Sequence, residues 1–281
     1  MAVEKDVYVL PRNPTEAERL HAQHEHYTRS FGGLLVHPSI DLQEYRSILD
    51  CCTGTGAWLR DARVASHAGA TFDACDQSLE QYEQNNPVAD QVYVQDITKP
   101  FPADLHGKYD LVHQRLLTAG IRRDQWPTAI ANVAQTLKPG GKLTLTELNL
   151  ELIRGAGNGT SEHLEWKNEL TRAWWKKANL VHNCADHIPD FMREAGLTDV
   201  QAIRLRVPYG AACLLIGMPE VSVDSSIRLY GGVSPALKRQ WVESGTGTAE
   251  EYDAKQAAHE EFLKSEGMWM DVNMVVGTKP L

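Results

Sequence analysis

The chain has 281 residues, with 28 Lys and Arg against 37 Asp and Glu, so its formal net charge is −9. This length predicts one large domain or a core with an accessory part, and a hydrophobic share of 42% is enough for a buried core. A net negative chain lacks the broad basic face that binds phosphate backbones, which argues against DNA or RNA as the main partner.

The five cysteines are scattered and contain no CxxC pair, which favours a reducing compartment. The first residues lack the apolar core of a signal peptide, and no stretch approaches the roughly 18 apolar residues of a membrane span. We therefore expect a soluble, cytoplasmic protein with no membrane partner.

Apolar runs and turn residues predict strands that alternate with helices, followed by a more helical second half. The predicted helices cover residues 14–30, 58–68, 79–85, 126–137, 161–180, 188–195, 234–243 and 249–266. The predicted strands cover residues 46–52, 70–74, 92–94, 109–113, 142–147, 200–207 and 268–276. Strands that alternate with helices and are joined by short loops indicate an α/β fold with a parallel sheet and helices on both faces.

A loop of small residues, Asp50-Cys51-Cys52-Thr53-Gly54-Thr55-Gly56, connects the first strand of this sheet to the following helix. Glycines at such a turn let the backbone approach a bound ligand, since a Cβ would collide with it. A dinucleotide-binding motif has a third glycine three residues after the second, but in this chain that position is Leu59. The alternative of a nicotinamide-dependent dehydrogenase therefore loses its best support.

The acid before this loop and the small residues within it resemble motif I of the class I S-adenosylmethionine-dependent methyltransferases. Asp76 lies 76 − 56 = 20 residues after the last glycine, where an acid can accept both ribose hydroxyls. Asp96 follows the third strand, where this family places an acid beside the adenine amino group, and residues 137–141 match the turn before the fifth strand. The resemblance implies a Rossmann-like, mostly parallel sheet of seven strands that binds S-adenosylmethionine.

Further segments resemble the fungal secondary-metabolism methyltransferases related to the global regulator of that metabolism. These segments are residues 18–35, 109–117 and 276–280, while Cys52 departs from the glycine or alanine of the usual pattern. Cysteine is small, so we expect cofactor binding to survive. The resemblance implies a single domain over residues 1–281, with a helical N-terminal cap (1–44), a cofactor-binding core (45–150), and lid helices with the last two strands (151–281).

The resemblance, together with the carboxyl ends of the strands, assigns roles to individual residues. The cofactor-binding candidates are Asp50, Cys52, Thr53, Gly54, Thr55, Gly56, Asp76, Gln77, Asp96, Ile97, His113 and Gln114. The catalytic candidates are His113, His24 and Glu147, because a general base helps when the nucleophile carries a proton. The substrate candidates are Tyr27, Trp166, Trp174 and Arg115. A histidine that ends a buried strand is more often structural, and aromatic residues on such helices more often pack on a core.

Metal-dependent members of the fold place acids at the end of the fourth strand, where this chain has His113-Gln114-Arg115, so we predict no metal. The predicted function is methylation of oxygen, nitrogen or carbon in a small-molecule natural product, by a monomer or homodimer. One alternative is a cofactor-binding cyclase or pericyclase that keeps the methyl group and uses the sulfonium charge. Another is a regulatory protein that acts through partner proteins.

Overall fold

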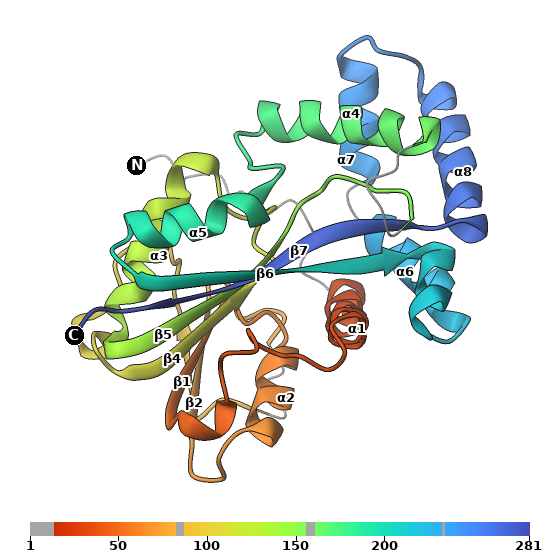
Figure 1. The fold of residues 1–281 in the computed structure, drawn as a ribbon. Helices are drawn as coiled ribbons and strands as arrows, with labels where there is room; N and C mark the ends of the chain where they lie inside the picture. The colour runs from red at the N-terminus through yellow and green to blue at the C-terminus, as the bar shows by residue number, and fades with distance from the viewer. Residues whose placement is uncertain (1–13, 83–86, 156–160, 232–233) are drawn as a thin grey trace.

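The computed structural model describes residues 14–82, 87–155, 161–231 and 234–281. One seven-stranded sheet forms its centre, in the order β3-β2-β1-β4-β5-β7-β6 (Figure 1). The strands are β1 (Ser47–Cys51), β2 (Thr71–Asp76), β3 (Gln91–Val94), β4 (Tyr109–Arg115), β5 (Leu137–Leu148), β6 (Thr198–Tyr209) and β7 (Met268–Thr278). β1 to β5 pair in parallel, and β7 is antiparallel to both of its neighbours. The predicted Rossmann-like sheet is confirmed.

Helices cover both faces of the sheet (Figure 1). α3 (Trp126–Gln135) and α5 (Cys184–Glu194) lie on one face, where their apolar side chains join a buried cluster with β1, β4 and β5. α2 (Ala57–Ala65) packs on the other face, and α1 (Pro14–Ser30) lies beside it across the carboxyl ends of the strands. Within the described ranges, every helix is too short or too polar to span a bilayer.

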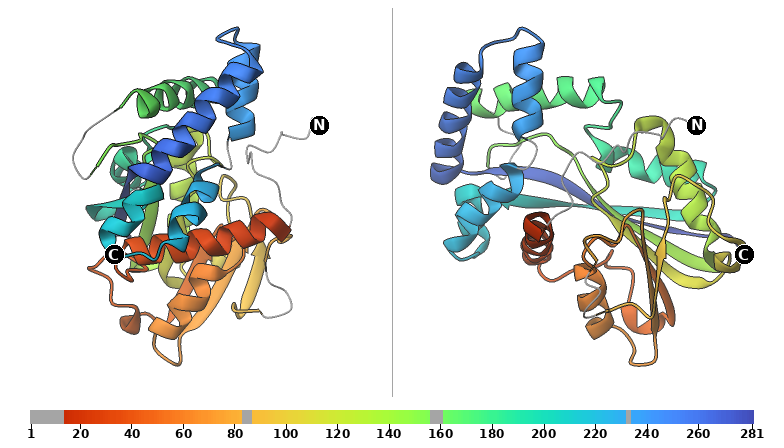
Figure 2. Two further views of the ribbon diagram at one scale, coloured as in Figure 1. Left: turned by 90° about the vertical axis from the view of Figure 1, so that its right-hand side faces the viewer. Right: turned by 180° about the vertical axis from the view of Figure 1, so that it is seen from behind.

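Three further helices form a separate layer beyond one end of the sheet (Figure 2). These are α4 (Glu162–Lys177), α7 (Ser234–Glu243) and α8 (Ala249–Ser265), and their shared core includes Leu170, Leu237, Trp241 and Tyr252. The sequence predicted all three, but it did not predict α6 (Val221–Tyr230). This helix contains β-branched and serine residues that weaken local helix propensity, and tertiary contacts with α1, α8 and β6 favour it instead.

The helix predicted over residues 79–85 is wrong for its first half, and residues 83–86 lie outside the described ranges. Residues 79–82 form a turn, in which Tyr82 N donates to Leu79 O at 3.2 Å. The Tyr82 hydroxyl also accepts a hydrogen bond from Ala89 N at 3.0 Å, and its ring packs beside Gly56. These tertiary contacts override the local preference for helix.

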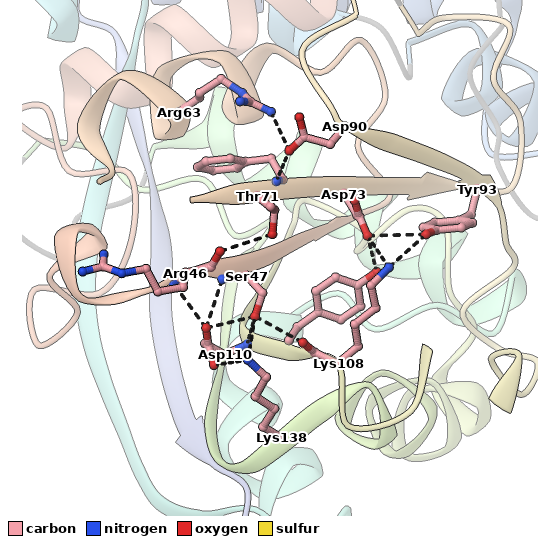
Figure 3. A network of polar contacts seen from close by, with 12 residues as sticks. Arg46, Ser47, Arg63, Thr71, Asp73, Asp90, Tyr93, Lys108, Asp110 and Lys138 are labelled. Carbon is pink, nitrogen blue, oxygen red and sulfur yellow. Dashed lines mark hydrogen bonds and ion pairs between the residues drawn. The ribbon is translucent and has the colours of Figure 1, made fainter. Parts of the chain in front are cut away.

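A polar network joins the strands at their amino ends, on the edge opposite to the carboxyl ends (Figure 3). The Asp110 carboxylate accepts hydrogen bonds from Ser47 N at 3.0 Å, Ser47 Oγ at 2.9 Å and Lys138 Nζ at 2.7 Å. These bonds connect β1, β4 and the start of β5. Nearby, Lys108 Nζ donates to the Asp73 carboxylate at 2.7 Å and so attaches β4 to β2.

Asp110→Asn is expected to lower the free energy of unfolding at pH 7 by about 1–2 kcal/mol, because a charged acceptor of several hydrogen bonds is lost. Burial alone would raise the pKa of Asp110, but Lys138, Ser47 and the Arg46 N–H together hold it below its ordinary value. A depressed pKa contributes stability above the unfolded-state pKa, and this stability is lost as pH falls through the folded-state pKa. Urea denaturation at pH 7 and at about pH 3 should therefore show a larger difference between the proteins at pH 7 than at the lower pH. An equal loss at both values would contradict the charge argument, and Asp190→Asn on the surface of α5 is the control.

Candidate functional site

A cleft opens at the carboxyl ends of β1, β2 and β4, with about 1020 Å³ of empty space including its open mouth. The loop between β1 and α2 forms one wall, and Leu20 and Gln23 of α1 reach over it. The lining comprises Leu20, Gln23, Asp50, Cys52, Thr53, Gly54, Thr55, Ala57, Trp58, Asp76, Gln77, Gln81, Gln95, Asp96, Ile97, Thr98, Arg115, Leu116, Leu117, Gly120 and Ile121. The carboxyl edge of an open α/β sheet is where such folds bind ligands.

Asp50 organises the loop at the base of this cleft. Its side chain is nearly buried, and its two oxygens accept hydrogen bonds from Thr53 Oγ1 and His113 Nδ1, each at 2.7 Å. Asp50 and His113 lie opposite each other in the parallel pairing of β1 and β4, so their side chains point to the same face. The Trp58 ring stacks on His113 with centroids 3.5 Å apart. These hydrogen bonds order the loop at the base of the cleft.

The backbone conformation of the loop favours glycine at two positions. Gly54 and Gly56 have φ of +56° and +82°, and a Cβ on Gly56 would lie 3.1 Å from the Tyr82 ring. The Gly54 N–H donates to Asp76 Oδ2 at 3.0 Å, which connects the loop to the end of β2. The loop therefore presents the backbone of Gly54 to the cleft, in a conformation that favours glycine.

Cys52 adopts φ of +55°, a left-handed conformation that favours glycine. This conformation accounts for glycine in the usual pattern at this position, since the loop turns here. Cys52 also lines the cleft and packs against the core. Burial raises the pKa of its thiol well above the ordinary value, so the thiol is neutral at physiological pH.

Cys52→Gly is expected to be more stable than Cys52→Ala by about 1 kcal/mol, the reverse of the usual order. Both variants lose the thiol, so the comparison isolates the cost of a side chain at positive φ. Urea denaturation of the two variants measures the difference. A more stable alanine variant would show that the loop does not hold this conformation in solution.

The predicted cofactor residues lie along the carboxyl edge in strand order. Asp76 ends β2, and Asp96 follows β3 with its Oδ1 accepting hydrogen bonds from Thr98 N at 2.9 Å and Thr98 Oγ1 at 2.7 Å. Gln77 and Ile97 lie beside these acids in the lining. The cleft thus presents two carboxylates from neighbouring strands next to a glycine loop.

The predicted residues of β4 divide between the cleft and the core. Arg115 lines the cleft, whereas His113 and Gln114 are both buried and lie outside the lining. Burial lowers the pKa of His113, against the effect of Asp50, and its Nε2 has no hydrogen-bond partner among the described residues. A role for His113 as a base toward a ligand in the cleft stays a prediction.

Glu147 lies beneath the cleft rather than in its lining. It is fully buried, and it accepts hydrogen bonds from Gln114 Nε2, Leu117 N and both the N–H and the hydroxyl of Thr118, at 2.7–3.1 Å. These bonds hold the segment that follows β4. The geometry therefore gives Glu147 a role in supporting this segment, and its predicted catalytic role stays a prediction.

The aromatic substrate candidates do not line the described cleft. Trp166 packs in the layer of α4, α7 and α8, with ring centroids 5.8 Å from Tyr252 and 6.2 Å from Trp241. Trp174 contacts Trp175 of the same helix. Tyr27 is buried, and its hydroxyl lies 3.0 Å from that of Tyr209. Both tryptophans are partly buried against the core of α4, α7 and α8 and lie outside this cleft, so a contact of Trp166 or Trp174 with substrate stays a prediction.

His24 of α1 lies between Arg115 and Asp61 and does not line the cleft. Sequence reasoning missed this connection, and it also missed Leu20, Gln23, Gln81, Gln95 and Ile121 in the lining. These lining residues lie close in sequence to predicted site residues, which is the signal that could have found them. Only the packing of α1 over the sheet, however, brings Leu20 and Gln23 to the cleft. Among the residues that the structure describes, no three His, Cys, Asp or Glu side chains are grouped to hold a metal ion.

A mostly parallel sheet with a glycine loop and two strand-end carboxylates around one cleft is typical of nucleotide-binding α/β proteins. A family model described as "Methyltransferase domain" matches residues 18–202, and the chain belongs to this family. The predicted membership of the class I methyltransferases is confirmed.

The chain is also similar to fungal proteins of secondary metabolism. It is 36% identical to methyltransferase grgD of a Penicillium species over 61% of this chain and 63% of grgD, so it matches less than two thirds of that relative. It is 26% identical to N-methyltransferase gliN of Aspergillus fumigatus, over 97% of this chain and 96% of gliN. It is 27% identical to the secondary metabolism regulator laeA of Coprinopsis cinerea, over 62% of this chain and 42% of laeA.

Among solved structures, PigF with SAH superposes with a TM-score of 0.52 at 15% identity, over 73% of this chain and 60% of PigF. At this identity the likeness concerns the fold, and it agrees with the seven-stranded sheet described above.

Proposed function

We propose that the protein is an S-adenosylmethionine-dependent methyltransferase that acts on a small-molecule natural product. The observation that carries the proposal is the connection between the glycine loop and Asp76, in which Gly54 N donates to the carboxylate at 3.0 Å. This contact brings a carboxylate and the loop backbone together at one point of the cleft. The cofactor requires both groups there, because its ribose adjoins the chain that carries the sulfonium.

The residues around the cleft fit this cofactor. Asp76 would accept hydrogen bonds from the ribose hydroxyls, since each carboxylate oxygen accepts more than one. Asp96, whose Oδ1 bonds to Thr98, would present Oδ2 to the adenine amino group. Ile97 and Ile121 of the lining supply apolar surface for the base.

S-adenosylmethionine supplies an activated methyl group, so the protein has to align the acceptor and exclude water. Leu116 and Leu117 follow β4 in the lining and present apolar side chains at this point. α1 closes the cleft from above through Leu20 and Gln23. These residues would contribute by positioning the acceptor and excluding water.

A nitrogen acceptor is favoured, because gliN, which matches nearly the whole chain, is named an N-methyltransferase. The proposed partner is thus a small molecule with a nucleophilic nitrogen and not a nucleic acid, which agrees with the net charge of −9.

The test is incubation with S-adenosylmethionine labelled in its methyl group and a panel of small nitrogen-containing natural products. We expect label in a product and formation of S-adenosylhomocysteine in equal amounts. Product that forms without label would support the cyclase alternative. Absence of S-adenosylhomocysteine binding in calorimetry would overturn the proposal altogether.

A further inference from the structure

The Arg115 side chain stands out among the cleft residues because most of its hydrogen-bonding capacity is unused. It lines the cleft at the end of β4, and one N–H donates to His24 Nδ1 at 2.7 Å. A guanidinium has five N–H donors and no acceptor, and this bond is the only one recorded for Arg115 within the described ranges. Burial lowers its pKa to about 10, so it remains positively charged at neutral pH. A positively charged side chain with further N–H donors in a cleft is suited to bind an anionic group.

Strand order indicates which part of the cofactor reaches Arg115. The adenine and ribose acids belong to β3 and β2, and the order β3-β2-β1-β4 places Arg115 three strands from Asp96. Three strand spacings amount to about 14 Å, which an extended nucleoside with an amino-acid chain can span. The end of the cofactor that lies over β4 is therefore the amino acid with its carboxylate.

His24 and Asp61 hold the guanidinium in place. Since Arg115 can only donate, His24 Nδ1 must accept, and the ring proton lies on Nε2, which donates to Asp61 Oδ2 at 2.9 Å. The three residues come from β4, α1 and α2, so the relay also attaches the N-terminal cap to the core.

We infer that Arg115 binds the α-carboxylate of the cofactor and that His24 and Asp61 are positioning residues that orient it. This inference rests on the proposed function and changes the role of Arg115 from substrate contact to cofactor anchor. The hydrogen bonds from Arg115 to His24 and from His24 to Asp61 require a neutral His24 ring. A proton on Nδ1 would leave the Arg115 N–H without an acceptor. The charged or titratable groups that face this ring are Arg115, Asp61 and His21, with His113 nearby.

The test compares two ligands that differ at the amino-acid end. S-adenosylhomocysteine carries the carboxylate, whereas 5′-methylthioadenosine keeps adenine, ribose and sulfur but lacks it. By calorimetry at pH 7, Arg115→Gln should weaken S-adenosylhomocysteine about 10- to 100-fold and leave 5′-methylthioadenosine within about twofold. Arg29→Gln, which removes the same charge from the exposed face of α1, is the matched control and should change neither affinity.

The positioning role has its own measurements. His24→Ala should weaken S-adenosylhomocysteine several-fold, and His24→Gln should restore most of the affinity, since an amide offers one acceptor and one donor at a similar spacing. Burial and Arg115 lower the pKa of His24 below 6.5, so the wild-type affinity should fall as pH is lowered from 7 through that pKa. The His24→Gln variant should lack this pH dependence, and 5′-methylthioadenosine should not show it in either protein.

The outcomes separate the two proposals. A wild-type protein that binds neither ligand would overturn the proposed function. A wild-type protein that binds both, with Arg115→Gln weakening both equally or neither, would overturn only the carboxylate assignment. Failure of His24→Gln to restore affinity or to remove the pH dependence would overturn the positioning role.

Discussion

Replacing Asp76 by asparagine is expected to weaken S-adenosylhomocysteine binding by about 3 kcal/mol, or roughly a hundredfold in Kd. Asp76 already accepts Gly54 N at 3.0 Å and Ser78 N at 3.2 Å, so its position at the end of β2 is fixed before a ligand binds. An amide would keep the shape but place a donor toward one ribose hydroxyl and remove the charge from both hydrogen bonds. Calorimetry with S-adenosylhomocysteine measures the change.

Asp73→Asn is the matched control, because Asp73 lies on the same strand near its amino end. It bonds to Lys108 and Tyr109 in the network of Figure 3 and is outside the cleft. This variant should lose stability but keep its affinity when folded. Equal weakening by both variants would show that the effect comes through the sheet and not from contact with the ribose.

Glu147→Ala is expected to lower the free energy of unfolding by about 3–5 kcal/mol, because it leaves a set of buried donors without an acceptor. Gln114, Leu117 and Thr118 all donate to this carboxylate, and Thr118 does so from both N–H and hydroxyl. Burial raises the pKa of Glu147, although these donors oppose the shift. Urea denaturation measures the loss of stability.

Glu151→Ala provides the comparison, since Glu151 follows the same strand but is partly exposed, with a side chain 42% accessible. Its effect should stay within about 0.5 kcal/mol. A Glu147→Ala protein that retained full stability and lost only turnover would contradict the structural role and support the predicted catalytic one.

Local sequence patterns predicted much of the fold. Alternating apolar strands and helices, with glycines at 54 and 56, predicted a parallel sheet with a ligand loop, and each of the seven strands overlaps a predicted one. β5 begins at Leu137, however, so residues 137–141, predicted as a turn, belong to the strand. These signals depend on side-chain periodicity and on backbone conformation, both of which are properties of short segments. The turn at residues 79–82 and the helix α6 were missed because contacts from elsewhere in the chain decide their conformations.

The acidic residues of the site could also be predicted from local sequence patterns. Asp50, Asp76 and Asp96 come at strand ends, and parallel strands bring their carboxyl ends to one edge whatever the details of packing. Whether a residue at that edge faces the ligand is a different question. Glu147 and Arg115 both belong to neighbouring strand ends, yet one is enclosed by donors and the other opens to the cleft.

The sequence by itself therefore determined the sheet, the position of the ligand loop and the acids beside it, because these depend on spacing along the chain. Only the tertiary structure decided that Trp166 lies under the α7–α8 hairpin, and that His24 joins Arg115 to Asp61. Both depend on how helices distant in sequence pack against the sheet, and no local pattern encodes which side chains then meet. Arg115 lies in the cleft as a cation bonded to His24, a contact that depends on the packing of α1 over the sheet.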